Sequence, residues 1–389
     1  MKKLKVMSVF GTRPEANKMA PLVQALSCEN RIESIVCVSA QHRQMLDQML
    51  AYFSITPQYD LDIMKKRQTL TGVATRVLEG MAEVLAEAVP DIVLVHGDTS
   101  TSFAAALAAF YAGIPVGHVE AGLRTYNKRE PFPEEMNRRL TGALADLHFA
   151  PTQLSKRHLL MENISEDSIY ITGNTAVDVI GMTHRADYQF EVPVLNTIDF
   201  TKHRVILMTA HRHENLGAPL EGICRAVKRI AENHKDVIVV YAVHLNPAVQ
   251  EPANAILGGV DRVILTEPLG LADMHNLMMR SYMILSDSGG LQEEAPSMRK
   301  PVIVLRNVTE RPEGVDTGAL KLAGTNEDVI YDMASELLRD QAAYARMAAA
   351  PNPFGDGQAS HRIVQAILHR FGREAARPED YRHEKAPQK

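Results

Sequence analysis

Short apolar segments alternate with helix-length segments along most of the chain, and this alternation constrains the fold more than any other feature. Because two parallel strands cannot be joined by a tight turn, such a rhythm is typical of βαβ units with crossover helices. The sequence therefore predicts α/β domains built on doubly wound parallel sheets. The predicted strands cover residues 4–10, 32–40, 91–98, 114–120, 147–151, 168–174, 203–211, 236–244, 262–268, 282–287 and 300–306.

A polar, aperiodic stretch at residues 184–202 interrupts the rhythm. The chain has 389 residues, which is more than one hydrophobic core usually supports. We therefore expect two Rossmann-like domains facing a cleft, one over residues 1–183 and one over residues 203–358. The charged and weakly apolar segment 373–389 is expected to be a flexible tail.

Composition excludes several classes of partner. The net charge of −5 provides no large positive field for nucleic acid or an anionic membrane. No apolar stretch has the length and uniformity of a transmembrane helix, and the apolar start of the chain is broken by Lys5. Cys28, Cys37 and Cys224 show no CxxC spacing, which is typical of reduced packing residues in a cytoplasmic protein.

Polar side chains follow five of the predicted strands at the point where each strand ends. In open parallel sheets ligands bind outside the carboxyl ends of the strands, where loops and helix N-termini converge. The sequence therefore predicts a binding cleft that these residues share. They are Asp98, Glu120, His211, His244 and the run Ser288–Gly290.

The segment SDSGG at residues 286–290 joins a strand to a helix and can offer backbone N–H groups to a phosphate. An ordinary capped helix start, with Asp287 or Ser288 as the N-cap, explains the same residues equally well. Glu294 would then lie on that helix, either facing a ribose or solvated. Arg13 and Lys18 follow the first strand and either neutralise a diphosphate or belong to a solvated loop.

The acidic residues Asp98, Glu120 and Glu134 together provide the carboxylates that acid–base chemistry at a sugar requires. Singly, each is better explained as a structural carboxylate with an arginine partner. The candidate partners are Arg124, Arg138 and Arg139.

Histidines gather in the segment AHRHENLG at residues 210–217, where they suit a phosphate or a proton shuttle. A zinc site through His211, His213 and His244 is the competing interpretation, although no Cys or HExxH spacing supports it. No GxGxxG segment opens a helix, so a dinucleotide cofactor is not expected. We expect no cofactor and no metal.

Nine segments taken in order resemble the non-hydrolysing UDP-N-acetylglucosamine 2-epimerases, which have the GT-B architecture. The segments are GTRPEANKMAP, QHRQML, HGDTSTS, HVEAGLRT, PFPEEMNRR, AHRHEN, VHLNP, SDSGGLQEEAP and TERPEG. The resemblance implies an isomerase that supplies precursors for bacterial surface polysaccharide. It also implies a homodimer and a C-terminal helix, at residues 359–372, that packs back on the first domain.

The same resemblance assigns roles to individual residues. It implies UDP phosphates at Ser288, Gly289 and Gly290, a ribose at Glu294, and a second substrate molecule bound as an activator. The implied catalytic residues are Asp98, Glu120, Glu134 and His211; further substrate-binding residues are Arg13, Lys18, His244 and Arg311; activator residues are Gln41, His42, Gln44 and Arg67. The chain departs from the family pattern at Asn17, His213 and Ala319.

Epimerisation at C2 of an N-acetylhexosamine requires an indirect route, because that C–H bond is not next to a carbonyl. Elimination of UDP to give 2-acetamidoglucal, followed by re-addition, meets this requirement. Four different functions stay open: an epimerase acting on a modified UDP-hexosamine such as a diacetamido uronate, a hydrolysing epimerase, a GT-B glycosyltransferase, and a sugar-nucleotide sensor without turnover.

Overall fold

A computed structural model describes residues 2–41, 43–65 and 68–383, which fold into two compact units. Unit 1 contains the chain to Val179 together with Gly355–Arg382, and unit 2 contains Ile180–Phe354. The chain first passes from unit 1 to unit 2 after Val179, inside one helix, and returns after Phe354. The sequence placed the first passage in the polar segment 184–202. Among the described residues, no helix is long and apolar enough to cross a membrane.

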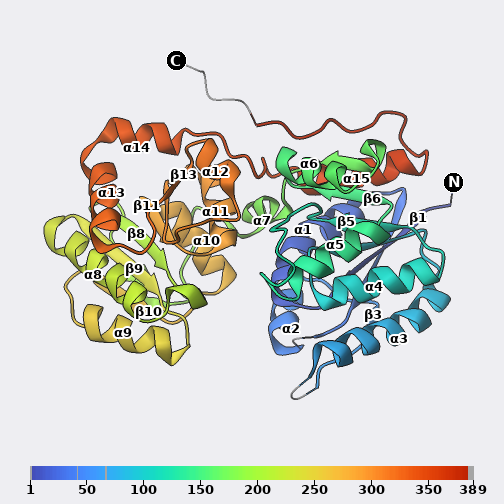
Figure 1. Cartoon of the computed structure of the whole chain (residues 1–389), viewed down its shortest axis with the longest axis horizontal. Helices are drawn as coiled ribbons and strands as arrows, with labels where there is room; N and C mark the ends of the chain where they lie inside the picture. The colour runs from blue at the N-terminus through green and yellow to red at the C-terminus, as the bar shows by residue number, and fades with distance from the viewer. Residues whose placement is uncertain (1, 42, 66–67, 384–389) are drawn as a thin grey trace. The chain divides into compact units, whose positions relative to one another are not determined.

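Unit 1 is built on a seven-stranded sheet in the order β3-β2-β1-β4-β5-β6-β7, with all neighbours parallel (Figure 1). Its strands are β1 (Leu4–Phe10), β2 (Ile32–Val38), β3 (Tyr59–Asp60), β4 (Ile92–His96), β5 (Val116–Val119), β6 (Leu147–Ala150) and β7 (Ile169–Ile171). Its helices are α1 (Arg13–Cys28), α2 (Arg43–Tyr52), α3 (Leu70–Ala88), α4 (Ser100–Tyr111), α5 (Glu134–Leu144), α6 (Gln153–Met161), the start of α7 (Thr175–Thr183) and α15 (Ala359–Arg370).

Close packing at the centre of unit 1 places the ends of β1 and β4 side by side. Small residues of α4, including Ala104, Ala105 and Ala108, pack with α3 and the central strands in one core cluster. A Cβ on Gly11 would lie 1.8 Å from the Ser39 hydroxyl and 2.9 Å from the hydroxyl of Thr101 in α4, the helix that follows β4, so only glycine fits where the chain leaves β1. The turns that follow β1 and β4 are therefore held close to each other.

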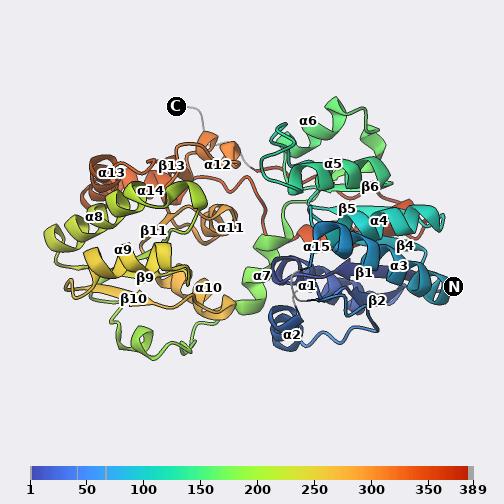
Figure 2. The same cartoon turned by 60° about the horizontal axis from the view of Figure 1, so that its bottom comes forward.

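Unit 2 is built on a six-stranded parallel sheet in the order β10-β9-β8-β11-β12-β13. Its strands are β8 (Arg204–Thr209), β9 (Val237–Ala242), β10 (Val263–Thr266), β11 (Met283–Ser286), β12 (Val302–Val304) and β13 (Leu320–Leu322). Its helices are α8 (Ala218–Asn233), α9 (Pro247–Leu257), α10 (Leu271–Arg280), α11 (Gly289–Glu294), α12 (Pro312–Asp316), α13 (Glu327–Arg339) and α14 (Gln341–Ala348). Figure 2 shows α8, α9 and α13 gathered beside this sheet, where their apolar residues share one core cluster.

The two sheets confirm the predicted class of two doubly wound parallel α/β domains. The short strands β3 and β13 were not predicted, because their sequences, YD and LKL, contain no apolar run. The polar segment 184–202 belongs to unit 2. Its backbone is held by the buried carboxylate of Asp273, which accepts from the N–H groups of Glu191 and Val192.

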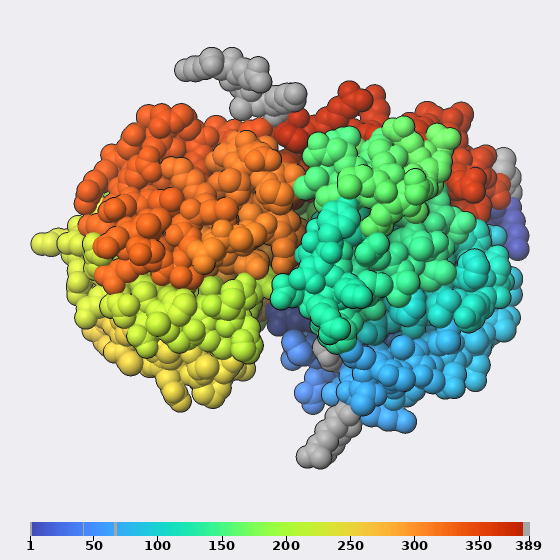
Figure 3. Space-filling view, in the orientation of Figure 1, coloured from blue at the N-terminus to red at the C-terminus, as the bar shows by residue number. Residues whose placement is uncertain are grey.

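The charged segment after α15 is not free where the structure describes it. The N–H of Tyr381 donates to the carbonyl of Ile171, and the N–H of Ile171 donates to Asp380, so the segment covers the edge strand β7. The guanidinium of Arg377 donates to the carbonyl of Ile169. Figure 3 shows the dark red C-terminal residues lying on the green part of unit 1. Composition predicted flexibility here, because edge pairing leaves no mark on composition.

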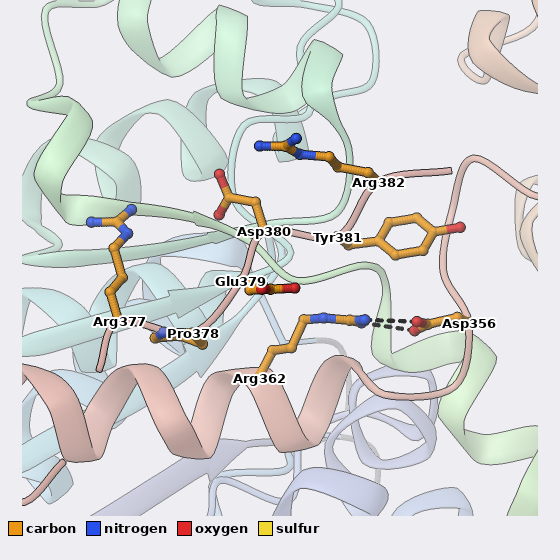
Figure 4. Close-up of a pocket in the computed structure, with 8 residues that line it drawn as sticks. All are labelled: Asp356, Arg362, Arg377, Pro378, Glu379, Asp380, Tyr381 and Arg382. Atoms are coloured by element: carbon orange, nitrogen blue, oxygen red, sulfur yellow. Dashed lines mark hydrogen bonds and ion pairs between the residues drawn. The ribbon is translucent and has the colours of Figure 1, made fainter. Parts of the chain in front are cut away.

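A pocket of about 480 Å³ lies under this segment in unit 1 (Figure 4). Arg362 of α15 projects into it and forms a two-pronged ion pair with Asp356. The same guanidinium donates to the carbonyl of Thr172, and its carbon lies 5.3 Å from the centroid of the Tyr381 ring. Arg362 thus contacts Tyr381 of the segment, Asp356 before α15 and Thr172 after β7 at the same time.

Candidate active site

The turn after β1 is organised by the buried side chain of Glu15. One oxygen of Glu15 accepts from the backbone N–H groups of Gly11 and Thr12, and the other accepts from the Thr99 hydroxyl at 2.6 Å. Thr12 caps α1 and Thr99 caps α4, so one carboxylate joins two helix starts. This junction fixes the turn that carries Asp98 relative to the helix that carries Lys18.

Asp98 lies in the turn after β4, where it faces an arginine. Its Oδ2 lies 2.6 Å from the Arg138 guanidinium, and its carbonyl accepts from the Asn137 amide at 2.9 Å. Burial raises the pKa of Asp98 to about 6, with Arg138 opposing and the charges of Glu120 and Glu134 assisting the rise. A carboxyl group with this pKa can both take up and release a proton near neutral pH.

Glu120, directly after β5, adopts a left-handed backbone with a φ of 63°. This conformation is costly for a glutamate and persists where the surroundings enforce it. Its Oε2 receives a short contact from the Lys18 ammonium and a 2.8 Å hydrogen bond from the Asn174 amide. Burial lowers the pKa of nearby His96 to about 4, so this imidazole is neutral at pH 7. Two donors on one oxygen favour an ionised Glu120.

The remaining unit 1 candidates are less constrained. Glu134 is half-buried at the first position of α5, and Arg13 is half-buried at the start of α1. The neighbour of Glu134, Glu135, is fully buried and accepts from the N–H groups of Thr125 and Tyr126. Glu135 therefore supports the loop before α5, while Glu134 is left closer to the surface.

The arginines considered as structural partners pair with three carboxylates, since Arg138 also lies 3.7 Å from Glu135. Arg138 pairs with Asp98, as the sequence allowed. Arg124 and Arg139 pair instead with Glu162, at 2.8 and 3.5 Å. Of the three candidate carboxylates, Asp98 is thus the one that has one of these arginines as an ion-pair partner among the described contacts.

The predicted activator residues are only partly described. His42 and Arg67 lie outside the described residues. Gln41 is half-buried, and its side-chain oxygen accepts from Thr101 of α4 at 3.0 Å. Gln44 is exposed on α2. The position of Gln41 therefore depends on the helix that starts in the Asp98 turn.

In unit 2, the buried carboxylate of Asp287 organises the loop after β8. Its Oδ2 accepts from the N–H groups of His211 and Arg212, both at 2.8 Å, and from the Asn215 amide at 3.0 Å. Its Oδ1 lies 3.3 Å from the His211 imidazole. Burial lowers the pKa of His211, and the charge of Asp287 opposes this change. Asp287 thereby links the end of β11 to the predicted histidine.

The turn Ser288–Gly290 lies between two guanidinium groups. A Cβ on Gly289 would lie 3.8 Å from the nearest Arg212 nitrogen and 3.9 Å from the nearest Arg311 nitrogen. Ser288 occupies the N-cap position of α11, and among the described residues its side chain makes no capping hydrogen bond. Arg311 also forms an ion pair with the buried Glu293, and the N–H of Ser288 donates to Ser286. The N–H groups of Gly289 and Gly290 beside Arg212 and Arg311 still form an arrangement suited to a phosphate.

The other unit 2 candidates lie around this turn. Glu294 closes α11, and its Oε2 lies 3.4 Å from the buried imidazole of His275. The rings of His211 and His244 stack with centroids 5.6 Å apart. In the part of the chain that the structure describes, no three His, Cys, Asp or Glu side chains are placed to hold a metal ion, so the zinc cluster considered from the sequence is not formed.

Several residues that hold the candidate site residues of unit 1 and unit 2 in place were not singled out from the sequence. They are Glu15, Glu135, Asn174, Arg212, His275 and, as a loop anchor, Asp287. The capping-box spacing of Thr12 and Glu15 is the one sequence signal that points to such a role. The others act across 10 to 76 residues of sequence, which no local pattern records.

Known proteins resemble this chain over nearly its whole length. The model of the UDP-N-acetylglucosamine 2-epimerase family matches residues 24–368. The UDP-N-acetylglucosamine 2-epimerase of Bacillus subtilis is 56% identical, over 98% of this chain and 99% of that protein.

Two solved structures extend the similarity to three dimensions. S. aureus MnaA, solved with UDP, is 50% identical with a TM-score of 0.86 and covers 98% of this chain and 100% of its own. UDP-GlcNAc 2-epimerase from Neisseria meningitidis, bound to UDP-GlcNAc, is 46% identical with a TM-score of 0.84 and covers 94% and 100%. The chain therefore belongs to the UDP-N-acetylglucosamine 2-epimerase family.

Proposed function

We propose that this protein reversibly converts UDP-N-acetylglucosamine to UDP-N-acetylmannosamine without hydrolysis. The observation that carries the proposal is the pair of carboxylates in unit 1. Asp98 has a pKa of about 6, while Glu120 receives two donors on one oxygen. Two neighbouring carboxyl groups with different environments divide proton transfer and charge stabilisation between them.

The nucleotide is held by unit 2 in this proposal. Arg212, Arg311 and the glycine turn after Ser288 receive the diphosphate, and Glu294 accepts from the ribose hydroxyls. His211 and His244 lie beside the phosphates, where a donor offsets charge on departing UDP. The relatives from S. aureus and N. meningitidis, whose structures contain UDP and UDP-GlcNAc, support this choice of ligand.

The chemistry belongs to unit 1. Asp98 takes the proton from C2, the electrons of that C–H bond form the C1–C2 double bond, and UDP leaves with the electrons of the C1–O bond. Re-addition of UDP to 2-acetamidoglucal, with a proton delivered to the opposite face of C2, gives the epimer. Positive charge develops at C1 during both steps, and ionised Glu120 stabilises it, with Glu134 assisting. Arg13 and Lys18 balance the negative charges nearby.

Further features complete the proposal. Gln41, His42, Gln44 and Arg67 bind a second UDP-sugar as an activator, and the protein works as a cytoplasmic homodimer that supplies precursors for surface polysaccharide. No cofactor takes part. Light scattering of the purified protein tests the dimer, and a sigmoidal dependence of rate on substrate tests the activator site.

Incubation with UDP-N-acetylglucosamine in heavy water, followed by NMR, tests the reaction itself. We expect both UDP-linked epimers with deuterium at C2. Epimerisation with full retention of the C2 proton would contradict elimination.

The same NMR assay separates the competing functions. Free N-acetylmannosamine would identify a hydrolysing epimerase, and a new glycoside formed with an added acceptor would identify a glycosyltransferase. Faster turnover of a modified UDP-hexosamine, such as a diacetamido uronate, would identify that sugar nucleotide as the preferred substrate. Binding of the UDP-sugar with neither exchange nor product would identify a sensor.

A further inference from the structure

The amide of Asn174 is anchored at one end and presented to a carboxylate at the other. Asn174 is buried and follows β7, immediately before α7. Its Oδ1 accepts from the N–H of Ala176 at 3.0 Å. A backbone N–H can only donate, so this bond fixes which end of the amide carries the oxygen. The NH₂ group must therefore face Glu120, whose Oε2 lies 2.8 Å away.

We propose that Asn174 is a positioning residue that holds Glu120 as a correctly oriented, ionised carboxylate during the reaction. Glu120 has the left-handed φ of 63°, so its side chain is not placed by a relaxed backbone. Lys18 supplies charge to the same oxygen through a long, flexible side chain, whereas the Asn174 amide is short, buried and fixed at both ends. The amide thus supplies the orientation that the ammonium group does not.

The proposal rests on the proposed function, because it assumes that Glu120 acts on the sugar. It adds a residue that acts through Glu120 rather than on the reacting atoms. Among the described residues, the charged and titratable groups that contact Glu120 or interact with its charge include Lys18 from α1, His96 at the end of β4 and Asp98 in the turn that follows. The negative charge introduced by Asn174→Asp raises the pKa of the nearby base Asp98, which by itself would make the ratio of wild-type to variant rates grow as pH falls, so a ratio that shrinks cannot come from the titration of Asp98.

The variant Asn174→Asp separates the two ends of the amide. It keeps an acceptor for Ala176 and the size of the side chain, but it replaces the donor with a second carboxyl group beside Glu120. At pH 8 we expect kcat to fall about 10- to 100-fold, the value of one hydrogen bond to a charged group. As pH falls, the introduced carboxyl group gains a proton and again donates to Glu120, since two close carboxylates share a proton readily.

The expected result is therefore a ratio of wild-type to variant kcat that shrinks at least several-fold between pH 8 and pH 6. The Kd for UDP, measured by calorimetry, should stay within about twofold, because UDP is bound elsewhere. A ratio that is constant across this range, or a loss confined to KM, would overturn the proposal. If Asn174→Asp does not fold, Asn174→Ala tests the same division between kcat and KM.

Asp178→Asn is the matched control on the same helix. The Asp178 carboxylate accepts from the N–H groups of Ala359 and Ser360 and so caps α15, whereas the amide of Asn174 contacts Glu120 and Ala176. This variant should lose stability while its kcat ratio to wild type stays flat with pH. A ratio that shrinks here as it does in Asn174→Asp would overturn the proposal, by showing that any damage to α7 has this effect.

Wild-type exchange at C2 in heavy water is measured alongside these variants. Its absence contradicts the proposed function. Its presence together with a flat Asn174→Asp ratio contradicts only the role of Asn174. The two failures are therefore distinguishable.

Discussion

The site residues of unit 1 and unit 2 are built in opposite ways. In unit 1 the key carboxylates are shielded and each is engaged by specific cations or amides; the side chains of Glu120 and Asp98 are 8% and 27% exposed. In unit 2 the predicted histidine His211 is more open, with a side chain that is 38% exposed, and two guanidinium groups flank a glycine turn. Shielded carboxylates have tunable proton affinity, whereas a glycine turn beside guanidinium groups suits an anion, although the Arg311 side chain is 12% exposed and is also paired with Glu293.

Each unit also contains a fully buried carboxylate that accepts hydrogen bonds from the backbone of a loop near its site residues. In unit 1 this is Glu135, which holds the backbone at Thr125 and Tyr126. In unit 2 it is Asp287, which holds the backbone at His211 and Arg212. The two anchors differ in what surrounds them, so they allow loop support and ligand chemistry to be separated by matched substitutions.

The largest expected effect is that of Asp98→Asn on turnover. The variant keeps the size of the side chain and removes the proton acceptor. Turnover should fall by about two to four powers of ten, the usual contribution of a positioned acid or base. Steady-state assays with purified variant measure this loss. A fall of less than about threefold would show that another group transfers the proton. The assignment of proton chemistry to Asp98 of unit 1 would then be wrong.

The next effect is on stability, through Asp287→Ala in unit 2. Removal of this carboxylate leaves the N–H groups of His211 and Arg212 and the Asn215 amide without their shared acceptor. We expect the free energy of unfolding to fall by about 2–4 kcal/mol, together with weaker UDP binding. Denaturant titration and calorimetry measure the two quantities.

Glu135→Ala in unit 1 is the counterpart of that variant. It should destabilise the protein to a comparable extent while leaving UDP affinity within about twofold. Equal losses of UDP affinity in Asp287→Ala and Glu135→Ala would show that loop support, rather than the unit in which it lies, controls nucleotide binding.

A smaller effect is expected from Glu294→Ala. This substitution removes the carboxylate assigned to the ribose and leaves the guanidinium groups of Arg212 and Arg311 in place. UDP binding should weaken by about 1.5–3 kcal/mol, the value of hydrogen bonds to a charged group. Calorimetry measures the change in UDP affinity. An unchanged affinity would show that Glu294 does not bind the nucleotide.

The smallest effect is a displacement of the pH profile in Arg138→Gln. Asp98 must be ionised to accept a proton, so kcat/KM of the wild type should fall as pH drops below about 6. The charge of Arg138 lowers the pKa of Asp98. Removal of this charge should therefore shift the acidic limb of the kcat/KM profile to higher pH, by about one pH unit. Profiles of kcat/KM between pH 5 and 9 measure the shift. A shift of the acidic limb to lower pH would contradict the effect of Arg138 on the pKa of Asp98.

Much of the fold follows from local pattern. The strands β1, β4, β8 and β9 are mostly apolar along five to seven residues, because burial on both faces of a parallel sheet leaves that pattern. The passage inside α7 escaped prediction, since a helix that continues from one unit into the next shows no break in composition. The segment 373–382 escaped it because its hydrogen bonds to β7 are made mainly by backbone and long charged side chains.

The site follows from the sequence only in part. Strand-end position pointed to Asp98 and Glu120, and the glycine pair pointed to the turn after Ser288. Their supporting partners could not be predicted, because the amide of Asn174 meets Glu120 across 54 residues of sequence. The raised pKa of Asp98 was equally hidden, since it depends first on burial and then on charges brought close by folding.

The central claim is that proton chemistry lies with unit 1 and nucleotide binding with unit 2. Two assays on Asp98→Asn and Glu294→Ala, calorimetry with UDP and C2 exchange in heavy water at saturating substrate, test it most directly. The account predicts that Asp98→Asn loses exchange and retains UDP affinity, and that Glu294→Ala loses UDP affinity and retains most exchange. Loss of UDP affinity in Asp98→Asn with exchange retained would contradict the division.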